Sequence, residues 1–348
     1  MNEFAIENRK IGPNYPPLVI AEVGINHEGE LSKAIQMVDA AKKVGAEVIK
    51  FQCHITHHEM IPTDMTPGDI SSEKLYDIIK RCELTEEEEL YIQKYCKEKE
   101  ILYLSTPFSR EAALRLNKMK VPAFKIGSGE CNNLPLIDLI AEFGKPIILS
   151  TGMNNIDTIK KTIEVINNRV PLSLMHCTSM YPTPYEKVRL GAIEQLQNTF
   201  NLPVGLSDHS INIWTCLGAV ALGACILEKH FTISRSWPGP DVKISIEPDE
   251  LKNLIIGSES IWKARGGKKT ILEEEKPVID FAYATVVSIK NIKVGEVFTE
   301  NNIWVKRPGV GQISASLFKN IIGKKASKNI KVNQHLKKSD VINFEHSQ

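Results

Sequence analysis

From residue 18 to about residue 265, the sequence repeats one pattern eight times: a short apolar run, a polar or glycine-containing turn, and an amphipathic helical stretch. This alternation predicts parallel strands, because a parallel neighbour can be reached only through a crossover connection. Eight such units close a β/α (TIM) barrel of roughly 250 residues. An open doubly wound sheet is the alternative, but no G-x-G-x-x-G follows the first apolar run. The pattern therefore favours the barrel.

The expected strands are Leu18–Gly24, Val48–Gln52, Leu102–Pro107, Ala123–Ser128, Pro146–Thr151, Leu172–Cys177, Pro203–His209 and Cys225–Phe231. Helices are expected to follow them, for example at 31–44, 190–200 and 212–223. Thr85 with Glu88 three residues later predicts a capping box at a helix start. Residues 57–72 contain Pro62, Pro67 and Gly68 with little periodicity, which predicts a long loop on the strand-end side of the barrel.

The repeat stops near Arg265, which divides the chain into a barrel domain at 1–265, a linker at 266–280 and a small β-rich domain at 281–348. A module of that last size is marginally stable alone. We therefore expect it to pack against something else, such as the barrel of a second copy.

Bulk composition gives no reason to expect nucleic acid or a membrane as a partner. Lys plus Arg number 43 against 42 Asp plus Glu, and no apolar run reaches the roughly 18 residues that a membrane span requires. The first residues lack a secretory signal, so a cytoplasmic location is expected. The seven cysteines contain no C-x-x-C pair, which favours reduced packing residues over disulfides or a thiolate zinc site.

Polar residues close nearly every expected strand, at the barrel end where TIM-barrel sites lie. They are Glu22, Lys50, Gln52, Thr106, Lys125, Ser128, Ser150, His176, Asp208, His209, Glu228 and His230, with Tyr181 shortly after the sixth strand. So many polar strand ends predict a small-molecule site.

Lys50 and Lys125 each interrupt an apolar strand, and a barrel interior does not bury a lone ammonium group cheaply. Each lysine therefore needs an anion beside it. The hydroxyls expected near them are Thr106, Ser128 and Ser150. Together these groups favour a small ligand with phosphate and carboxylate groups. The alternative is internal pairing with carboxylates, for which the candidates are Glu22, Glu130 and Glu228.

His209 and His230 close the seventh and eighth strands, which are neighbours about 5 Å apart in a barrel. Two imidazoles with further positions open to water or substrate would make a catalytic metal site. Alternatively, the two rings could simply hydrogen-bond to each other. His54, His57 and His58 form a denser cluster, but we expect them in the long loop, which lacks a rigid scaffold for metal ligands.

Ordered motifs along the chain resemble the bacterial N-acetylneuraminate (sialic acid) synthases. They are Glu22–His27, Lys50–Gln52, Ser105–Ser109, Lys125–Glu130, Ser150–Met153, Tyr181–Pro184, Gly205–His209, Leu227–Phe231, Pro238–Asp241 and Trp304–Gly309. The last of these resembles the antifreeze-like (SAF) module of those enzymes. The resemblance runs nearly end to end.

The resemblance implies condensation of phosphoenolpyruvate with N-acetylmannosamine, giving N-acetylneuraminate and phosphate. A divalent metal, Mn2+ first with Mg2+ or Co2+ as alternatives, would be held by His209 and His230. The implied catalytic residues are Glu22, Lys50, Lys125 and Asp241, and the implied substrate-binding residues are Gln52, Thr106, Ser128, Ser150, Ser179, Tyr181 and Arg307. Arg307 would act from the other subunit of a domain-swapped homodimer.

Two positions depart from the typical sialic acid synthase pattern: Phe51 stands where His is frequent, and Ser179 where Asn is typical. Related legionaminic or pseudaminic acid synthases, which take 2,4-diacetamido-trideoxy sugars, resemble this chain at both places. A legionaminic acid synthase is therefore the alternative within the same mechanism. A non-catalytic saccharide-binding protein is a remote alternative, because no strand-end Lys, His or Glu is missing.

Overall fold

The computed structural model describes residues 3–68 and 72–344, which form two compact units. One unit runs to Gly266 and the other begins at Gly267. No helix in the described ranges is long and apolar enough to cross a membrane.

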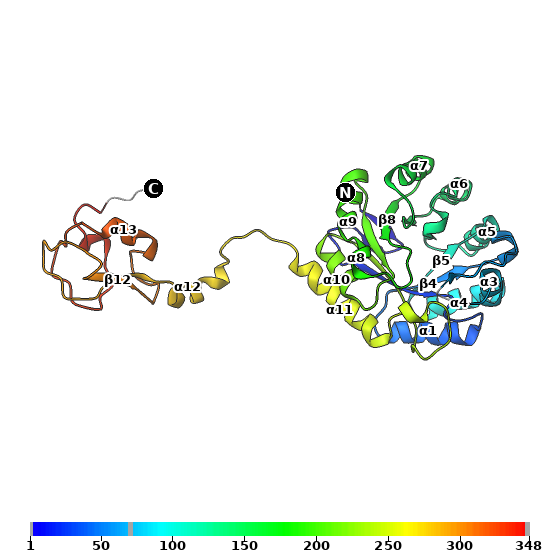
Figure 1. Ribbon diagram of the computed structural model, residues 1–348, viewed down its shortest axis with the longest axis horizontal. Helices are drawn as coiled ribbons and strands as arrows, with labels where there is room; N and C mark the ends of the chain where they lie inside the picture. The colour runs from blue at the N-terminus through cyan, green and yellow to red at the C-terminus, as the bar shows by residue number, and fades with distance from the viewer. Residues whose placement is uncertain (1–2, 69–71, 345–348) are drawn as a thin grey trace. The chain divides into compact units, whose positions relative to one another are not determined.

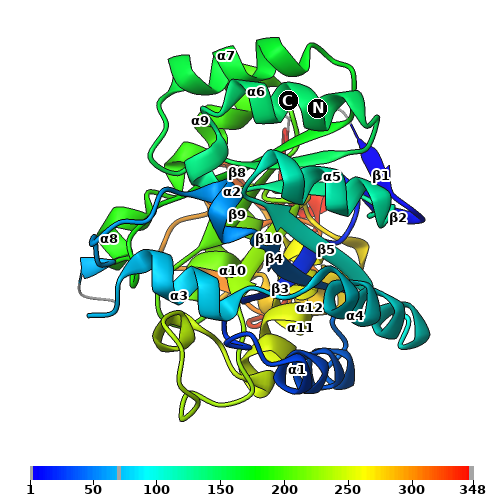
Figure 2. The ribbon, with the colours of Figure 1, turned by 90° about the vertical axis from the view of Figure 1, so that its right-hand side faces the viewer.

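The first unit contains eight parallel strands in the hydrogen-bonded order β5-β4-β3-β10-β9-β8-β7-β6. Their bounds are β3 Leu18–Gly24, β4 Val48–Cys53, β5 Leu102–Pro107, β6 Phe124–Ile126, β7 Ile147–Ser150, β8 Leu172–Cys177, β9 Val204–Asp208 and β10 Ile226–His230. Strands consecutive in the chain are neighbours, and β5 and β6, at the two ends of this order, also contact each other. The sheet is thus a nearly closed barrel, which confirms the expected fold class (Figures 1 and 2).

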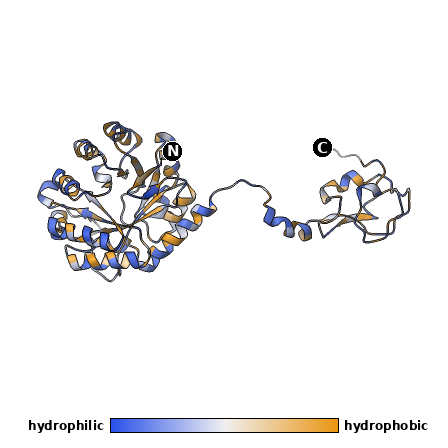
Figure 3. Cartoon of the chain, turned by 180° about the vertical axis from the view of Figure 1, so that it is seen from behind, coloured by the Kyte–Doolittle hydropathy of each residue, from blue (hydrophilic) through white to orange (hydrophobic). Residues whose placement is uncertain are grey.

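Helices follow the strands and surround them (Figure 2). They are α1 Leu31–Lys43, α2 Thr56–Glu59, α3 Leu75–Cys82, α4 Glu86–Glu98, α5 Arg110–Lys118, α6 Leu134–Glu142, α7 Ile156–Ile166, α8 Tyr185–Val188, α9 Gly191–Phe200, α10 Trp214–Ala221 and α11 Pro248–Ala264. Figure 3 shows hydrophilic and hydrophobic residues on the same helices, as expected for elements with one face in water. The predicted capping box is present, with Thr85 and Glu88 bonded reciprocally at the start of α4.

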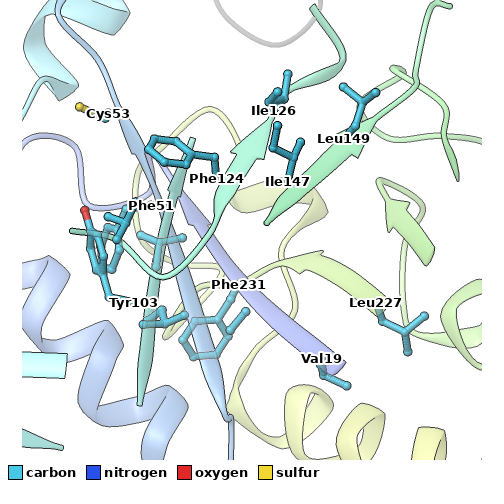
Figure 4. Packing of buried hydrophobic residues seen from close by; sticks show 14 of the residues in the cluster. Val19, Phe51, Cys53, Tyr103, Phe124, Ile126, Ile147, Leu149, Leu227 and Phe231 are labelled. Carbon is cyan, nitrogen blue, oxygen red and sulfur yellow. The ribbon is translucent and has the colours of Figure 1, made fainter. Parts of the chain in front are cut away.

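The barrel strands pack apolar side chains on both faces. Val19, Phe51, Phe124 and Leu227 belong to a large cluster between the strands and the helices (Figure 4). A second cluster of buried apolar residues lies in the barrel interior and contains Leu18, Ile20, Val48, Leu104, Ala123, Ile148, Met175, Cys225 and Ile226. Ile6 and Ile11, from the hairpin β1 Phe4–Ile6 and β2 Arg9–Ile11, join this inner cluster. One end of the barrel interior is thereby filled with apolar groups.

The second unit has its own apolar core around Val286, Phe298 and Leu336. Its antiparallel pair is β11 Thr285–Ser288 and β12 Ile303–Lys306. The remaining elements are the helices α12 Lys276–Ala282 and α13 Phe318–Ile321 and the short 3-10 turns η4 Glu273–Glu275, η5 Ala315–Leu317 and η6 Lys338–Asp340. A small β-containing domain thus follows the barrel, as expected.

Two local expectations were wrong. Ser128 does not extend a strand but begins the 3-10 turn η2 Ser128–Glu130, because the chain leaves the sheet after Ile126. His57 and His58 are not in a loop but on the short helix α2. The expected loop continues from residue 60 to 67 without helix or strand, and its residues 69–71 lie outside the described ranges. All seven cysteines are buried and free, as expected.

Candidate active site

A polar layer lies directly above the apolar filling of the barrel. Because side chains alternate along a strand, a residue two positions after an inward apolar one also points inward. Glu22, Lys50, Thr106, Lys125, Ser150 and Glu228 stand two positions after Ile20, Val48, Leu104, Ala123, Ile148 and Ile226, respectively. All six polar side chains are buried. Because of the strand period, these six predicted polar residues lie together in one layer at the C-terminal end of the barrel.

Ion pairs connect the four charged members of this layer. Lys50 Nζ lies 2.7 Å from Glu22 Oε2 and 3.7 Å from Glu228 Oε2, and Lys125 Nζ lies 3.4 Å from Glu228 Oε1. Internal pairing, weighed as the alternative for these lysines, is therefore present. Its partners are Glu22 and Glu228, whereas Glu130 accepts a hydrogen bond from Asn133.

Two hydroxyl groups also accept hydrogen bonds from the two lysines. Lys50 Nζ donates to Thr106 Oγ1 at 3.0 Å, and Lys125 Nζ donates to Ser150 Oγ at 2.7 Å. Within the described residues, Oε2 of Glu22 and Oε2 of Glu228 are buried and take no hydrogen bond of regular geometry. Glu228, predicted both as a polar strand-end residue and as a possible partner of the lysines, stands at an inward strand position beside both of them.

The two glutamates differ in proton affinity. Burial raises the pKa of Glu22 to about 7, against the opposing charge of Lys50. Burial acts in the same direction on Glu228, but Lys125 and Lys50 outweigh it and lower its pKa to about 2. Burial lowers the pKa of Lys125, while the two carboxylates raise that of Lys50 against the effect of burial. The layer therefore holds one carboxyl group that can change charge near neutral pH.

Ser128 and Ser179 come together around a glycine. A Cβ on Gly152 would lie 2.5 Å from Ser179 Oγ and 2.7 Å from Ser128 Oγ, so no other residue leaves room for both hydroxyls. Ser128 Oγ accepts from the backbone N–H of Gly152 at 3.0 Å. Ser179 Oγ is buried and has no hydrogen-bond partner among the described residues, which makes it available to a ligand.

The histidine pair lies where the strand order predicted it. The ring centroids of His209 and His230 are 5.5 Å apart, and the ring of Tyr181 lies 4.1 Å from that of His209. Asp241 Oδ2 is 3.7 Å from His230 Nδ1. Gly24, in the left-handed conformation at φ +56°, lets Asp241 approach, since a Cβ there would lie 2.9 Å from its carboxylate.

These residues fit a metal ion on chemical grounds. Burial holds the pKa of His230 well below its ordinary value, so the ring is neutral, and its buried Nδ1 has no hydrogen bond in the described residues. His209 Nδ1 hydrogen-bonds to the Thr178 carbonyl at 3.0 Å, which fixes the ring. No group of three or more His, Cys, Asp and Glu in residues 3–68 and 72–344 has metal-site geometry. The pair would need water or substrate as further ligands.

Behind the strands, Asp208, one of the predicted polar strand ends, pairs with Lys229, which the sequence did not predict as part of the site. Lys229, between Glu228 and His230, points outward and is fully buried, with its Nζ 2.6 Å from Asp208 Oδ2. Asp208 Oδ2 also accepts from Ser210 Oγ and Thr215 Oγ1, both at 2.9 Å. The available signal was a lysine at an outward position of a buried strand, which requires a partner.

The remaining predicted residues lie in different places. Gln52 Nε2 donates to Glu22 Oε1 at 3.1 Å, so Gln52 belongs to the site. Phe51 points away from it and stacks on Tyr103 in the outer core. Arg307 is exposed and directly follows β12 in the second unit.

Comparison with known proteins agrees with this geometry. Residues 37–270 match the NeuB family and residues 283–342 match the SAF domain. An uncharacterised protein of Methanocaldococcus jannaschii is 40% identical over 89% of this chain and 90% of its own length. The N,N'-diacetyllegionaminic acid synthase of Campylobacter jejuni is 39% identical over 90% of this chain and 97% of its own.

Among solved structures, the N-acetylneuraminic acid (sialic acid) synthetase of Leptospira borgpetersenii is similar with a TM-score of 0.73 and 34% identity. That similarity covers 80% of this chain and 95% of the other. The family match spans most of the barrel, and the relatives are matched over nearly their full length. The chain therefore belongs to the NeuB family and carries a C-terminal SAF domain.

Proposed function

We propose that this protein condenses phosphoenolpyruvate with an N-acylated amino sugar to give a nonulosonic acid and phosphate. The observation that carries this proposal is the layer of Lys50 and Lys125 with their hydroxyl partners, next to the His209 and His230 pair at the same end of the barrel. The lysine layer suits the anionic phosphoenolpyruvate, and the neighbouring histidine pair suits activation of the sugar aldehyde. Their proximity suits a reaction between the two substrates. The synthases among the relatives support it.

The lysine layer would bind phosphoenolpyruvate. Lys50 and Lys125 supply the charge, and Thr106, Ser150 and Ser128 supply hydroxyl groups for phosphate and carboxylate oxygens. Because Glu22 titrates near neutral pH, its protonation leaves the two lysines with only Glu228 to balance them. The layer can therefore become net positive when the anion arrives.

In the reaction, C3 of phosphoenolpyruvate forms a bond to the aldehyde carbon of the open-chain sugar, whose oxygen takes a proton and becomes a hydroxyl. Water adds to the cationic C2 and loses a proton, and cleavage of the bond from C2 to the phosphate oxygen releases phosphate. A divalent cation at His209 and His230, which we propose to be Mn2+, would supply Lewis acidity for the aldehyde. In this proposal Glu22 would hold or release a proton near the attacking C3, and Asp241 would accept a hydrogen bond from a sugar hydroxyl.

For the sugar, we favour a 2,4-diacetamido-2,4,6-trideoxyhexose over N-acetylmannosamine. The N,N'-diacetyllegionaminic acid synthase of C. jejuni, 39% identical over 90% of this chain, supports this choice. Of the two departures from the sialic acid pattern, only Ser179 faces the site, because Phe51 is buried behind the strand. The short hydroxyl at 179 leaves room for a larger sugar substituent. N-acetylmannosamine stays the second candidate.

We further propose that the protein works in the cytoplasm as a domain-swapped homodimer in which Arg307 reaches the sugar in the other subunit. Arg307 is exposed in a unit of its own, which leaves its guanidinium available to a partner. A guanidinium suits the carbonyl oxygen of an acylamino group.

A substrate panel tests the function. The protein is incubated with phosphoenolpyruvate, Mn2+ and either N-acetylmannosamine or the 2,4-diacetamido sugar; phosphate release is followed and the product is identified by mass spectrometry. We expect the diacetamido sugar to give at least about tenfold higher kcat/KM. A reversed preference would select N-acetylmannosamine. No phosphate release with any N-acylated sugar would contradict the proposed reaction and favour a saccharide-binding protein.

A further inference from the structure

A chain of hydrogen bonds leads out of the active site along the end of β4. Gln52 Nε2 donates to Glu22 Oε1 at 3.1 Å, and Gln52 Oε1 lies 2.9 Å from Nε2 of His54. The other ring nitrogen of His54, Nδ1, lies 2.8 Å from Oε2 of Glu59 on α2. Four side chains thus form one continuous path from the charged layer to the helix that follows β4.

His54 is held tightly in this path. Its side chain is 3% exposed, and its ring stacks on Phe108 with centroids 4.6 Å apart and planes 14° apart. The helix that carries Glu59 is anchored in turn, because Glu83 Oε2 accepts hydrogen bonds from both the backbone N–H and the hydroxyl of Thr56. The imidazole therefore has a fixed position relative to Gln52.

The direction of each hydrogen bond follows from the groups involved. A carbonyl oxygen can only accept, so in this orientation of the Gln52 amide His54 Nε2 donates to Gln52 Oε1, and the hydrogen bond between Nδ1 and Glu59 Oε2 contains one further proton, on either of those two atoms. The amide nitrogen of Gln52 is then turned toward Glu22. In the opposite amide orientation, the nitrogen of Gln52 would face Nε2, and its oxygen would face Glu22 Oε1, where two acceptors repel while Glu22 is ionised. The proton on His54 Nε2 thereby selects one orientation of the Gln52 amide.

We propose that His54, fixed by Glu59, is a positioning residue that sets the orientation of the Gln52 amide and thus the hydrogen-bonding groups that Gln52 offers to the sugar. The inference rests on the proposed function, in which Gln52 faces the sugar. When a buried neighbour already fixes a substrate-binding side chain, that side chain loses less conformational entropy when the substrate binds. His54 is therefore a determinant of sugar affinity rather than of phosphoenolpyruvate binding.

Two matched variants test this role. In His54→Gln the side-chain amide nitrogen can stand where Nε2 stands and donate to Gln52, whereas the shorter His54→Asn reaches only the position of Nδ1. We expect His54→Asn to raise the KM for the sugar about tenfold and leave the KM for phosphoenolpyruvate within about twofold. His54→Gln should recover most of the loss. Equal effects of both variants, or equal effects on both KM values, would show a merely structural role.

Glu59 provides a second pair. Glu59→Gln retains a group that can hydrogen-bond to Nδ1, and Glu59→Leu does not. We expect Glu59→Leu to raise the sugar KM several-fold and Glu59→Gln to remain close to the unaltered protein. A sugar KM that is unchanged in Glu59→Leu would overturn the link to α2.

A spectroscopic measurement separates this inference from the proposed function. Nitrogen NMR of the substrate-free protein with labelled histidine detects whether Nε2 of His54 carries a proton, with the signal assigned from its loss in His54→Gln. A protonated Nε2 supports the orientation of Gln52 whatever reaction the protein catalyses, and an unprotonated Nε2 overturns it. Failure of the proposed function would appear separately, as absence of turnover in the unaltered protein.

Discussion

Two buried ionic networks lie on opposite faces of the barrel strands, and they differ in how completely their polar atoms are paired. On the outer face, Asp208 accepts from Lys229 and from the backbone and hydroxyl of Ser210. On the inner side, Glu228 Oε2 lies 3.7 Å from Lys50 Nζ and has no hydrogen bond in the described residues, and neither has the nearby Ser179 Oγ. A fully paired network fixes a structure, whereas an incompletely paired one retains capacity for a ligand. The outer network is therefore structural, and the inner one is available for chemistry.

The largest effect is expected from breaking the outer network. Lys229→Met keeps the length of the side chain but leaves the Asp208 carboxylate buried without its cation. We expect the free energy of unfolding to fall by about 3–5 kcal/mol. Denaturant unfolding followed by tryptophan fluorescence measures this, since three of the four tryptophans, Trp214, Trp237 and Trp262, lie in the barrel unit.

Lys263→Met is the matched control for that prediction. Lys263 pairs with Glu259 one turn earlier on α11, and both side chains are largely exposed. Exposed pairs of this kind contribute at most about 0.5 kcal/mol. If Lys263→Met destabilised the barrel as much as Lys229→Met, burial would not be what separates the two networks.

The second effect concerns His209 and His230, which directly follow Asp208 and Lys229 in the sequence. His209→Ala and His230→Ala should each abolish Mn2+ dependence and lower kcat/KM by about a thousandfold or more, because a Lewis acid contributes several kcal/mol to such a step. Isothermal titration of the protein with Mn2+ reports metal binding without turnover. Full activity in either variant, with Mn2+ binding unchanged, would refute the metal assignment.

The sequence predicted the fold well because the strand and helix periods are strong local signals. Leu18–Gly24, Leu102–Pro107 and Leu172–Cys177 have the bounds that the apolar runs predicted. The strand expected at 123–128 is shorter, because a 3-10 helix begins at Ser128. The Ser128 hydroxyl accepts a hydrogen bond from the backbone N–H of Gly152. Alternation cannot detect a strand end that is set by such a tertiary contact.

The site was predictable to the extent that it follows from the strand period. Polar residues two positions after inward apolar ones converge at one end of a barrel, so Lys50 and Lys125 could be placed from the sequence. Pairings between residues far apart in the chain could not. The contact of Lys229 with Asp208, and the hydrogen bonds of His54, depend on which outward or loop positions face each other after folding.

Removal of an inner lysine should lower activity more than stability, whereas removal of the outer lysine should mainly lower stability. Lys125→Met leaves Glu228 with Lys50 at 3.7 Å and with the Ser207 hydroxyl at 2.9 Å, so the carboxylate is not left alone. We expect kcat/KM for phosphoenolpyruvate to fall about a hundredfold or more, with less than half the destabilisation of Lys229→Met. A loss of stability as large as in Lys229→Met would erase the contrast between the networks.

The smallest effect is a dependence on pH. Burial raises the pKa of Glu22 from 4.5 to about 7, so Glu22 is neutral below that value and ionised above it. While Glu22 is neutral, Lys50 and Lys125 face only the Glu228 carboxylate and the layer is net positive, which favours an anion. We therefore expect the KM for phosphoenolpyruvate to rise about tenfold from pH 6 to pH 8, measured by initial rates of phosphate release.

Glu22→Gln separates this effect from the titration of phosphoenolpyruvate itself. The amide keeps the size of the side chain but stays neutral, so the part of the pH dependence due to Glu22 should disappear. The raised pKa also means that the native protein binds this proton more tightly than the unfolded chain. The free energy of unfolding should therefore fall between pH 4.5 and about 7, and less so in Glu22→Gln. An unchanged pH profile in the variant would place the titrating group elsewhere in the inner network.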